Sequence, residues 1–267
     1  MKTGIRRGLR HVADVIDSGY ARLTLPRRFG ARVRVDVIGI YREPHPIAEV
    51  VAELTRSRHE VRVRLGAMGD AHPRLARCTA AAHMSAGKFQ NLNELLLMEG
   101  DGADFILVVD DDVTVPRGFL DRMIEVCQRL DLALAQPAQT RFSNANWSIA
   151  RRRFLSVARL TQFVEIGPVT LLRADAAELL TPFPAQLRYG WGLDFHWSHV
   201  MAAHGLRMGI VDALAVTHAT RKVASTYSWD AAQAEGRAYL ETVDHAPPSV
   251  AREGTLRTHR MVGRGMS

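Results

Sequence analysis

Cysteine and long hydrophobic runs are both scarce in this sequence. The chain has two cysteines in 267 residues, Cys78 and Cys127, and their spacing matches no metal-binding or redox motif. We therefore expect no disulfide framework, which is typical of proteins in a reducing compartment. No apolar run approaches the length of a transmembrane helix, and no apolar segment follows the basic N-terminus as in a secretory signal. These absences predict a cytoplasmic protein.

Acidic residues are scarce in the first 34 residues. This segment contains only Asp14 and Asp17 against nine basic residues, so it carries +7, which equals the net charge of the whole chain. The remainder is near neutral and contains no zinc-finger or RNP-like motif, so no nucleic-acid partner is expected. The basic residues are Lys2, Arg6, Arg7, Arg10, Arg22, Arg27, Arg28, Arg32 and Arg34.

The basic segment has the pattern of an amphipathic helix. Ile5, Leu9, Val12 and Ile16 recur at helical spacing, with basic residues on the other faces. Such a helix could bind a membrane surface or a partner, or it could pack its apolar stripe on the rest of the protein. The first interpretation predicts peripheral contact of residues 1–20 with the inner face of the membrane. The sequence leaves both open.

Strand and helix patterns alternate over residues 33–137. Such alternation predicts a mostly parallel α/β sheet flanked by helices. The predicted strands cover 33–40, 61–66, 105–109 and 132–137, and the predicted helices cover 47–54, 88–96 and 117–130.

The second half is less regular. A kinked strand is predicted over 163–172, another strand over 208–216, and helices over 174–180, 193–204 and 229–243. We expect four regions: a basic N-terminal segment (1–30), two halves of one domain (31–140 and 141–245), and a mobile C-terminal tail (246–267).

The stretch Phe105–Val109 is uniformly apolar and is followed by three carboxylates, Asp110, Asp111 and Asp112. The apolar run predicts a buried strand. Because side chains alternate along a strand, Asp110 and Asp112 are expected to point the same way. Open α/β sheets bind ligands at the carboxyl ends of their strands, and paired carboxylates suit Mg²⁺ or Mn²⁺.

Two further motifs follow the acidic stretch in order. They are Gly190-Trp191-Gly192-Leu193-Asp194 at the start of a predicted helix, and Val216-Thr217-His218 at the end of a predicted strand. Together with residues 88–93, this order resembles glycosyltransferases of the GT-A fold, specifically the family-two-like bacterial enzymes. The resemblance covers about residues 33–220 and implies a Rossmann-like sheet with a smaller acceptor-side region.

The resemblance implies a metal site on the diphosphate of a nucleotide-sugar donor. Asp112 would be the direct ligand, His218 a second ligand, and Asp110 a contact to the ribose or to the metal shell. Mixed oxygen and imidazole ligation suits Mn²⁺ or Mg²⁺. The donor-binding residues would be Lys88, Asn91, Asp110 and Asp111.

The same resemblance implies the catalytic and acceptor residues of a hexosyltransferase. Asp194 matches the general base of inverting members, although many relatives read Glu-Asp where this chain has Leu193-Asp194. Trp191, Gly192 and Glu165 would line the acceptor site, with the indole stacking on a sugar face. The acceptor hydroxyl could belong to a glycan, a lipid-linked molecule or a small molecule.

Three alternatives remain at this point. Gly192 and Asp194 could simply form a helix N-terminus. The acidic stretch also resembles the start of haloacid-dehalogenase-like phosphatases, in which Asp110 would be the nucleophile, but that motif usually follows the first core strand. A non-catalytic sugar-binding module is the third alternative.

Overall fold

The computed structural model describes residues 2–25, 29–98, 102–218 and 228–262, with side chains from residue 10 onward. The strands are β1 (Arg34–Tyr41), β2 (Glu60–Ala67), β3 (Thr79–Ala81), β4 (Phe105–Val109), β5 (Val113–Thr114), β6 (Leu132–Gln139), β7 (Ala158–Thr161), β8 (Val169–Arg173), β9 (Arg207–His218) and β10 (Thr255–His259). The helices are α1 (Lys2–Thr24), α2 (Ile47–Leu54), α3 (Lys88–Leu97), α4 (Phe119–Leu130), α5 (Ala174–Leu180), α6 (Leu193–Ala203), α7 (Trp229–Leu240) and α8 (Val250–Glu253).

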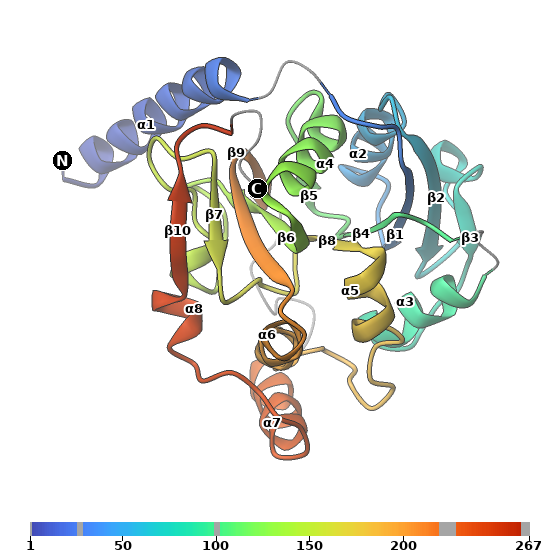
Figure 1. Cartoon of the computed structure of the whole chain (residues 1–267). Coiled ribbons are helices and arrows are strands. Elements are labelled where there is room, and N and C mark those ends of the chain that lie inside the picture. The colour runs from blue at the N-terminus through green and yellow to red at the C-terminus, as the bar shows by residue number, and fades with distance from the viewer. Residues whose placement is uncertain (1, 26–28, 99–101, 219–227, 263–267) are drawn as a thin grey trace.

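One mixed sheet runs through the molecule in the order β10-β7-β9-β6-β8-β4-β1-β2-β3, with β5 pairing separately with β9 (Figure 1). The pairs β2–β3, β1–β2, β1–β4 and β6–β9 are parallel. Strand β8 is antiparallel to both β4 and β6, and β7 is antiparallel to both β9 and β10. The α/β sheet predicted from the sequence is therefore confirmed: β1 to β4 are joined in parallel, and β7, β8 and β10 of the second half make the antiparallel pairs of the main sheet.

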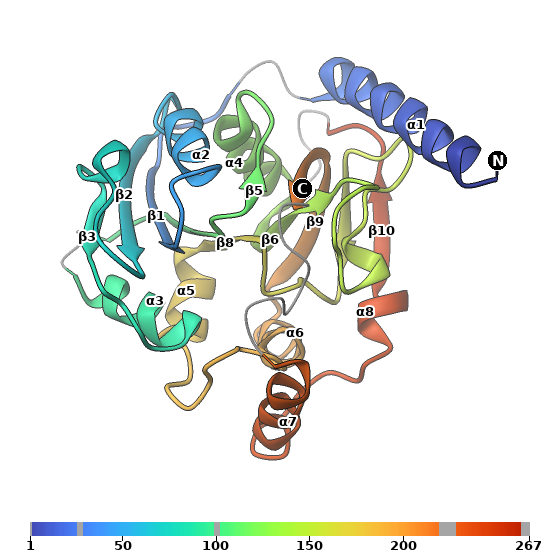
Figure 2. The same ribbon diagram turned by 180° about the vertical axis from the view of Figure 1, so that it is seen from behind.

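Helices cover both faces of this sheet, as Figures 1 and 2 show. Along β1 and β4, successive apolar side chains alternate between two cores: Val37 and Leu107 pack with α2 and α4, whereas Ile38 and Val108 pack with α3, α5 and α6. A strand buried on both faces needs apolar residues at every position. This requirement explains why Phe105–Val109 has no polar residue.

Two segments differ from the sequence prediction. The expected kinked strand over 163–172 is a strand only from Val169, and β3 lies between the predicted strand over 61–66 and the predicted helix over 88–96, where no strand was expected. Neither feature has a long hydrophobic alternation: β3 spans only three residues, and residues 163–168 supply buried side chains without joining a ladder.

The polar C-terminal segment also differs from the mobile tail that we expected. Residues 250–259 form α8 and β10, and β10 pairs with β7 at the edge of the sheet. An edge strand can be polar because only its backbone is required for pairing. Ala251 and Val262 are buried on either side of the strand and attach it to the body. Residues 263–267 lie outside the described part of the chain.

None of the helices in the described ranges combines the length and the apolar character that crossing a bilayer requires.

The packing of the C-terminal segment after β10 can be tested with two neighbouring residues. Val262 is 6% exposed within the core, whereas Met261 is 66% exposed. Val262→Asp should lower the free energy of unfolding by about 2 kcal/mol or more, because an unpaired carboxylate would be buried. Met261→Asp should change it by about 0.5 kcal/mol at most. Urea denaturation of both variants measures the difference, and equal stabilities would show that the segment is not part of the core.

Candidate functional site

A cavity of about 650 Å³ opens at the carboxyl ends of β1 and β4. The acidic stretch after β4 lines one part of it, and the start of α6 and one side of α7 line another. The predicted site residues all border this cavity: Lys88, Asn91, Asp110, Asp111, Asp112, Glu165, Trp191, Gly192, Asp194 and His218. Motifs far apart in the sequence therefore converge on one place.

The three carboxylates after β4 have separate partners rather than one common direction. Strand β4 ends at Val109, and Asp111 and Asp112 lie in a turn, so the strand alternation that we expected does not extend to them. Asp110 instead forms an ion pair with Lys88 (Nζ to Oδ1, 2.6 Å). Asp111 accepts a hydrogen bond from the backbone N–H of Arg42 (2.9 Å), which ties the end of β1 to the acidic turn.

Asp112 lies against His218, with 3.2 Å between Oδ1 and Nε2. The two-residue strand β5 produces this contact, because Val113 pairs directly with His218 of β9. Burial alone would lower the pKa of His218, but the hydrogen bond and the charge of Asp112 raise it. The His218 Nδ1 atom is buried and has no hydrogen-bond partner among the described residues.

This pair is the best candidate for holding a metal ion. No group of three or more His, Cys, Asp or Glu residues with metal-binding geometry occurs in the described ranges. An oxygen and imidazole pair nevertheless fits Mg²⁺ or Mn²⁺, which often take only one or two protein ligands and complete their shell with phosphate oxygens and water. Asp110 is held by Lys88, so its place in the metal shell stays a prediction.

The start of α3 forms the cavity wall beside Asp110. The backbone N–H of Lys88 donates to the carbonyl of Arg188 (3.1 Å). The side-chain amide of Asn91 is buried and donates to the carbonyl of Ala86 (3.2 Å). Asn91 therefore stabilises the loop before α3. Its predicted contact to a nucleotide-sugar would have to use the side-chain amide hydrogen or oxygen that this bond leaves.

The glycines around Trp191 shape the entry into α6. Gly190 and Gly192 have φ values of +81° and +94°, which side chains rarely tolerate. A Cβ atom on Gly190 would also overlap the ring of Phe89. Gly192 is the N-cap of α6, and Asp194 follows in its first turn. The helix-start interpretation of this motif is therefore correct as local structure, and it does not exclude a chemical role for Asp194.

Asp194 is 6% exposed and borders the cavity. Burial raises its pKa to about 7, although hydrogen bonds from the Phe195 N–H and from the Trp147 side chain partly oppose the shift. A carboxylate with a pKa near neutrality is suited to accept a proton from a bound substrate.

Glu165 is a second buried carboxyl group on the same cavity. Burial, followed by the charge of Asp194, raises its pKa to about 8. The Gln139 side-chain amide donates to Glu165 Oε2 (3.0 Å). At neutral pH Glu165 is therefore mostly protonated while Asp194 titrates, so the two groups differ in chemical character.

Trp191 lies edge to face with Trp229 of α7, with ring centroids 4.6 Å apart. Gly236 permits this approach, because a Cβ atom there would be 3.0 Å from the Trp191 Cβ atom. Both rings border the cavity, together with Trp147. The sequence prediction included Trp191 but missed the other two. Trp147 lies in an irregular loop, and Trp229 is the first residue of α7.

Basic residues also border the cavity without having been predicted. Besides Lys88, they are Arg42, Arg188 and Arg237. Arg42 directly follows β1, so its position after a predicted strand was the one available sequence signal. Arg188 and Arg237 come from a loop and from α7, where only the folded chain brings them to the site.

No known protein-family model matches the chain, and no curated protein matches it. Solved structures do. A mannosyltransferase, PcManGT from Pyrobaculum calidifontis in complex with GDP-Man and Mn²⁺, aligns with a TM-score of 0.54 over 91% of this chain and 75% of its own, at 17% identity. The S. aureus protein TarS in complex with UDP-GlcNAc aligns with a TM-score of 0.54 over 73% of this chain and 62% of its own, at 13% identity.

A third neighbour, GalNAc-T7 with UDP, GalNAc and Mn²⁺, aligns with a TM-score of 0.52 at 10% identity. It overlaps 70% of this chain and 43% of its own length. This chain has the GT-A fold. At these identities the likeness establishes the fold alone. Any activity has to be argued from the residues of this chain.

The buried carboxyl of Glu165 predicts an unusual dependence of stability on pH. The pKa rises from 4.5 to about 8 on folding, so the folded state binds the proton more tightly between these values. The free energy of unfolding should therefore fall as the pH rises through this window. Glu165→Gln should reduce the loss between about pH 5 and about pH 8 by about 2 kcal/mol or more.

Urea denaturation at both pH values measures this loss. Glu178→Gln, at an exposed position on α5, is the matched control and should keep the wild-type pH dependence. If Glu165→Gln also kept it, the Glu165 carboxyl would not titrate as a buried group.

Proposed function

We propose that the protein is a metal-dependent, inverting hexosyltransferase that moves a sugar from a nucleotide-diphosphate donor to an acceptor hydroxyl in the cytoplasm. The main support is the convergence, in one cavity of a GT-A fold, of the Asp112–His218 pair and the buried Asp194. The first is suited to a metal on a diphosphate, and the second is suited to remove a proton from the acceptor.

The donor side combines a metal pair with positive charge. Asp112 and His218 would hold Mn²⁺ or Mg²⁺, which when bound offsets the negative charge that a departing diphosphate develops. Lys88, Arg42 and Arg188 border the same cavity and would bind phosphate oxygens. Two of the structural neighbours were solved with Mn²⁺ and a nucleotide or nucleotide-sugar.

On the acceptor side, Asp194 would be the general base. Its pKa of about 7 leaves a large fraction charged at neutral pH, whereas Glu165, at about 8, remains mostly protonated. Asp194 would take the hydroxyl proton as the acceptor oxygen attacks the anomeric carbon from the face opposite the diphosphate. Glu165 and Gly192 would border the acceptor, and the Trp191 ring would pack on its apolar face.

The two alternative functions have weaker support. In this fold the acidic turn follows the fourth strand of the chain, and Asp110 is held in an ion pair with Lys88. Both features differ from a phosphatase nucleophile on the first core strand. A non-catalytic sugar-binding module would need no buried carboxylate with a pKa near 7, and an assay for transfer or hydrolysis of nucleotide-sugars would separate it from an enzyme.

Metal-dependent nucleotide binding tests the donor site. UDP, GDP or dTDP should bind in the presence of Mn²⁺ and lose affinity in EDTA. A nucleotide at about 100 times its Kd should add about 2.7 kcal/mol to the free energy of unfolding. Asp112→Asn should weaken binding by about tenfold or more, because it removes a charged metal ligand.

Calorimetric titration measures these affinities. Asp230→Asn, at an exposed position outside the cavity lining, is the control and should bind like the wild type. Equal binding with Mn²⁺ and with EDTA would contradict the proposed metal site.

Asp194→Asn tests the catalytic role. General-base catalysis is typically worth about 10²–10⁴-fold, so kcat should fall by that order while nucleotide affinity stays nearly unchanged. Wild-type kcat should rise with pH through about 7, because the charged carboxylate is the active form, and the variant should lack this rise.

Asp230→Asn is again the control, since Asp230 occupies the same place in α7 that Asp194 occupies in α6. A nearly silent Asp194→Asn would leave Asp194 with only a helix-start role. A product that retained the donor's anomeric configuration in NMR spectra would exclude inversion.

A further inference from the structure

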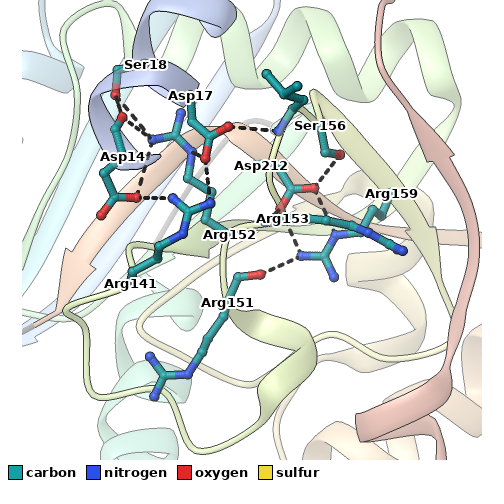
Figure 3. Close-up of polar contacts among 11 residues, drawn as sticks. Asp14, Asp17, Ser18, Arg141, Arg151, Arg152, Arg153, Ser156, Arg159 and Asp212 are labelled. Atoms are coloured by element: carbon teal, nitrogen blue, oxygen red, sulfur yellow. Dashed lines mark hydrogen bonds and ion pairs between the residues drawn. The ribbon is translucent and has the colours of Figure 1, made fainter. Parts of the chain in front are cut away.

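Helix α1 is attached to the body of the protein through its acidic side. Arg141 forms ion pairs with both aspartates, Nη1 to Asp14 Oδ1 at 2.6 Å and Nη2 to Asp17 Oδ2 at 2.7 Å (Figure 3). Ala21, one turn after Asp17, and Leu25, directly after the helix, are buried in the core. The helix therefore docks through the face that carries Asp14, Asp17 and Ala21.

The docking site is rigid because its own residues are anchored. The backbone N–H of Leu155 donates to Asp17 Oδ1 (2.8 Å), and the Arg152 guanidinium lies beside both aspartates and donates to the Ser18 hydroxyl (3.2 Å). Asp17 is 3% exposed. A buried carboxylate with several such partners cannot turn toward water without a large penalty, so the rotation of α1 about its axis is fixed.

This rotation leaves the apolar stripe of α1 facing outward. Val12, Val15, Ile16 and Leu23 are 55%, 60%, 46% and 75% exposed. Because successive residues of an α-helix are about 100° apart, these side chains lie on the side opposite Asp14 and Asp17. Val12 and Ile16, the two residues of the predicted stripe whose side chains are described, therefore do not pack on the protein.

The charge of α1 is also arranged asymmetrically. Its two acidic residues are both paired with Arg141 in the docked face. The basic residues of α1 therefore give the rest of the helix a positive charge. Arg10 and Arg22 are exposed. The sequence places three more basic residues in the N-terminal half, which extends beyond β10 in Figures 1 and 2: Lys2, Arg6 and Arg7.

We propose that α1 lies in the surface of an anionic membrane, with the apolar stripe inserted and the body of the protein on the water side. An exposed apolar stripe on a helix whose other faces carry Lys and Arg is the arrangement that binds lipid headgroups and the upper acyl region. A second copy of the chain fits this surface less well, because the basic residues of two α1 helices would repel each other.

Vesicle flotation tests the proposal with the full chain. The protein should bind vesicles that contain about 30% phosphatidylglycerol in phosphatidylcholine, and binding should fall in high salt and on pure phosphatidylcholine. Val15→Ser combined with Leu23→Ser should weaken binding by about tenfold or more, because it removes two apolar side chains that would insert.

The matched control is Leu97→Ser combined with Leu179→Ser, two exposed leucines on other helices, and it should bind like the wild type. Both double variants should keep the wild-type circular dichroism spectrum and melting temperature, since all four positions are exposed. Undiminished vesicle binding by the α1 variant, or no binding of the wild type to anionic vesicles, would overturn the proposal. A wild-type dimer that becomes monomeric in the α1 variant would also overturn it, because a second copy would then cover the stripe.

Discussion

The ion pair between Asp212 and Arg159 is the contact on which the second half of the molecule depends. Asp212 is completely buried, and Arg159 contacts both of its oxygens at 2.9 Å. The Arg159 guanidinium also donates to the carbonyl of Arg151, and Asp212 accepts the Arg153 N–H (Figure 3). The same guanidinium donates to the carbonyl of Ile149. A buried charge persists only when all its hydrogen bonds are made. The pair therefore holds the irregular segment between β6 and β7, residues 140–157, in place.

That segment links two parts of the protein that the sequence keeps separate. One side of it presents Arg141 and Arg152 to α1, and the other side carries Trp147 to the cavity that contains Asp194. The burial of Asp194 is not compensated by an arginine, so its pKa rises to about 7. Two buried aspartates of one fold therefore have different surroundings: Asp212 faces the Arg159 guanidinium, whereas Asp194 borders the cavity.

The sequence predicted the first half of the fold well and the second half only in part. Strands β1 and β4 have apolar residues that serve both faces of the sheet, and such runs are visible in the sequence. Strands β7 and β10 are short, and the side chains of β10 are largely polar, so their pairing depends on distant backbone that no local pattern reveals. The order of motifs correctly brought Asp112, Asp194 and His218 to one cavity. The partner of Asp110 was missed, because the strand ends one residue before it.

Helix α1 shows most clearly what a hydrophobic pattern leaves undecided. The periodicity of its apolar residues predicts a helix with one apolar stripe, and the usual outcome is that the stripe faces the core. Here the two acidic residues decide the orientation, because the half-buried Arg141 and the buried Arg152 of a distant loop lie against them. An ion pair that excludes water is far more demanding in geometry than apolar contact, so the paired aspartates face inward and Val12, Val15 and Leu23 face outward. The side on which such a helix docks is thus determined by a small number of buried charges, and those charges can be recognised only when their partners in the folded chain are known.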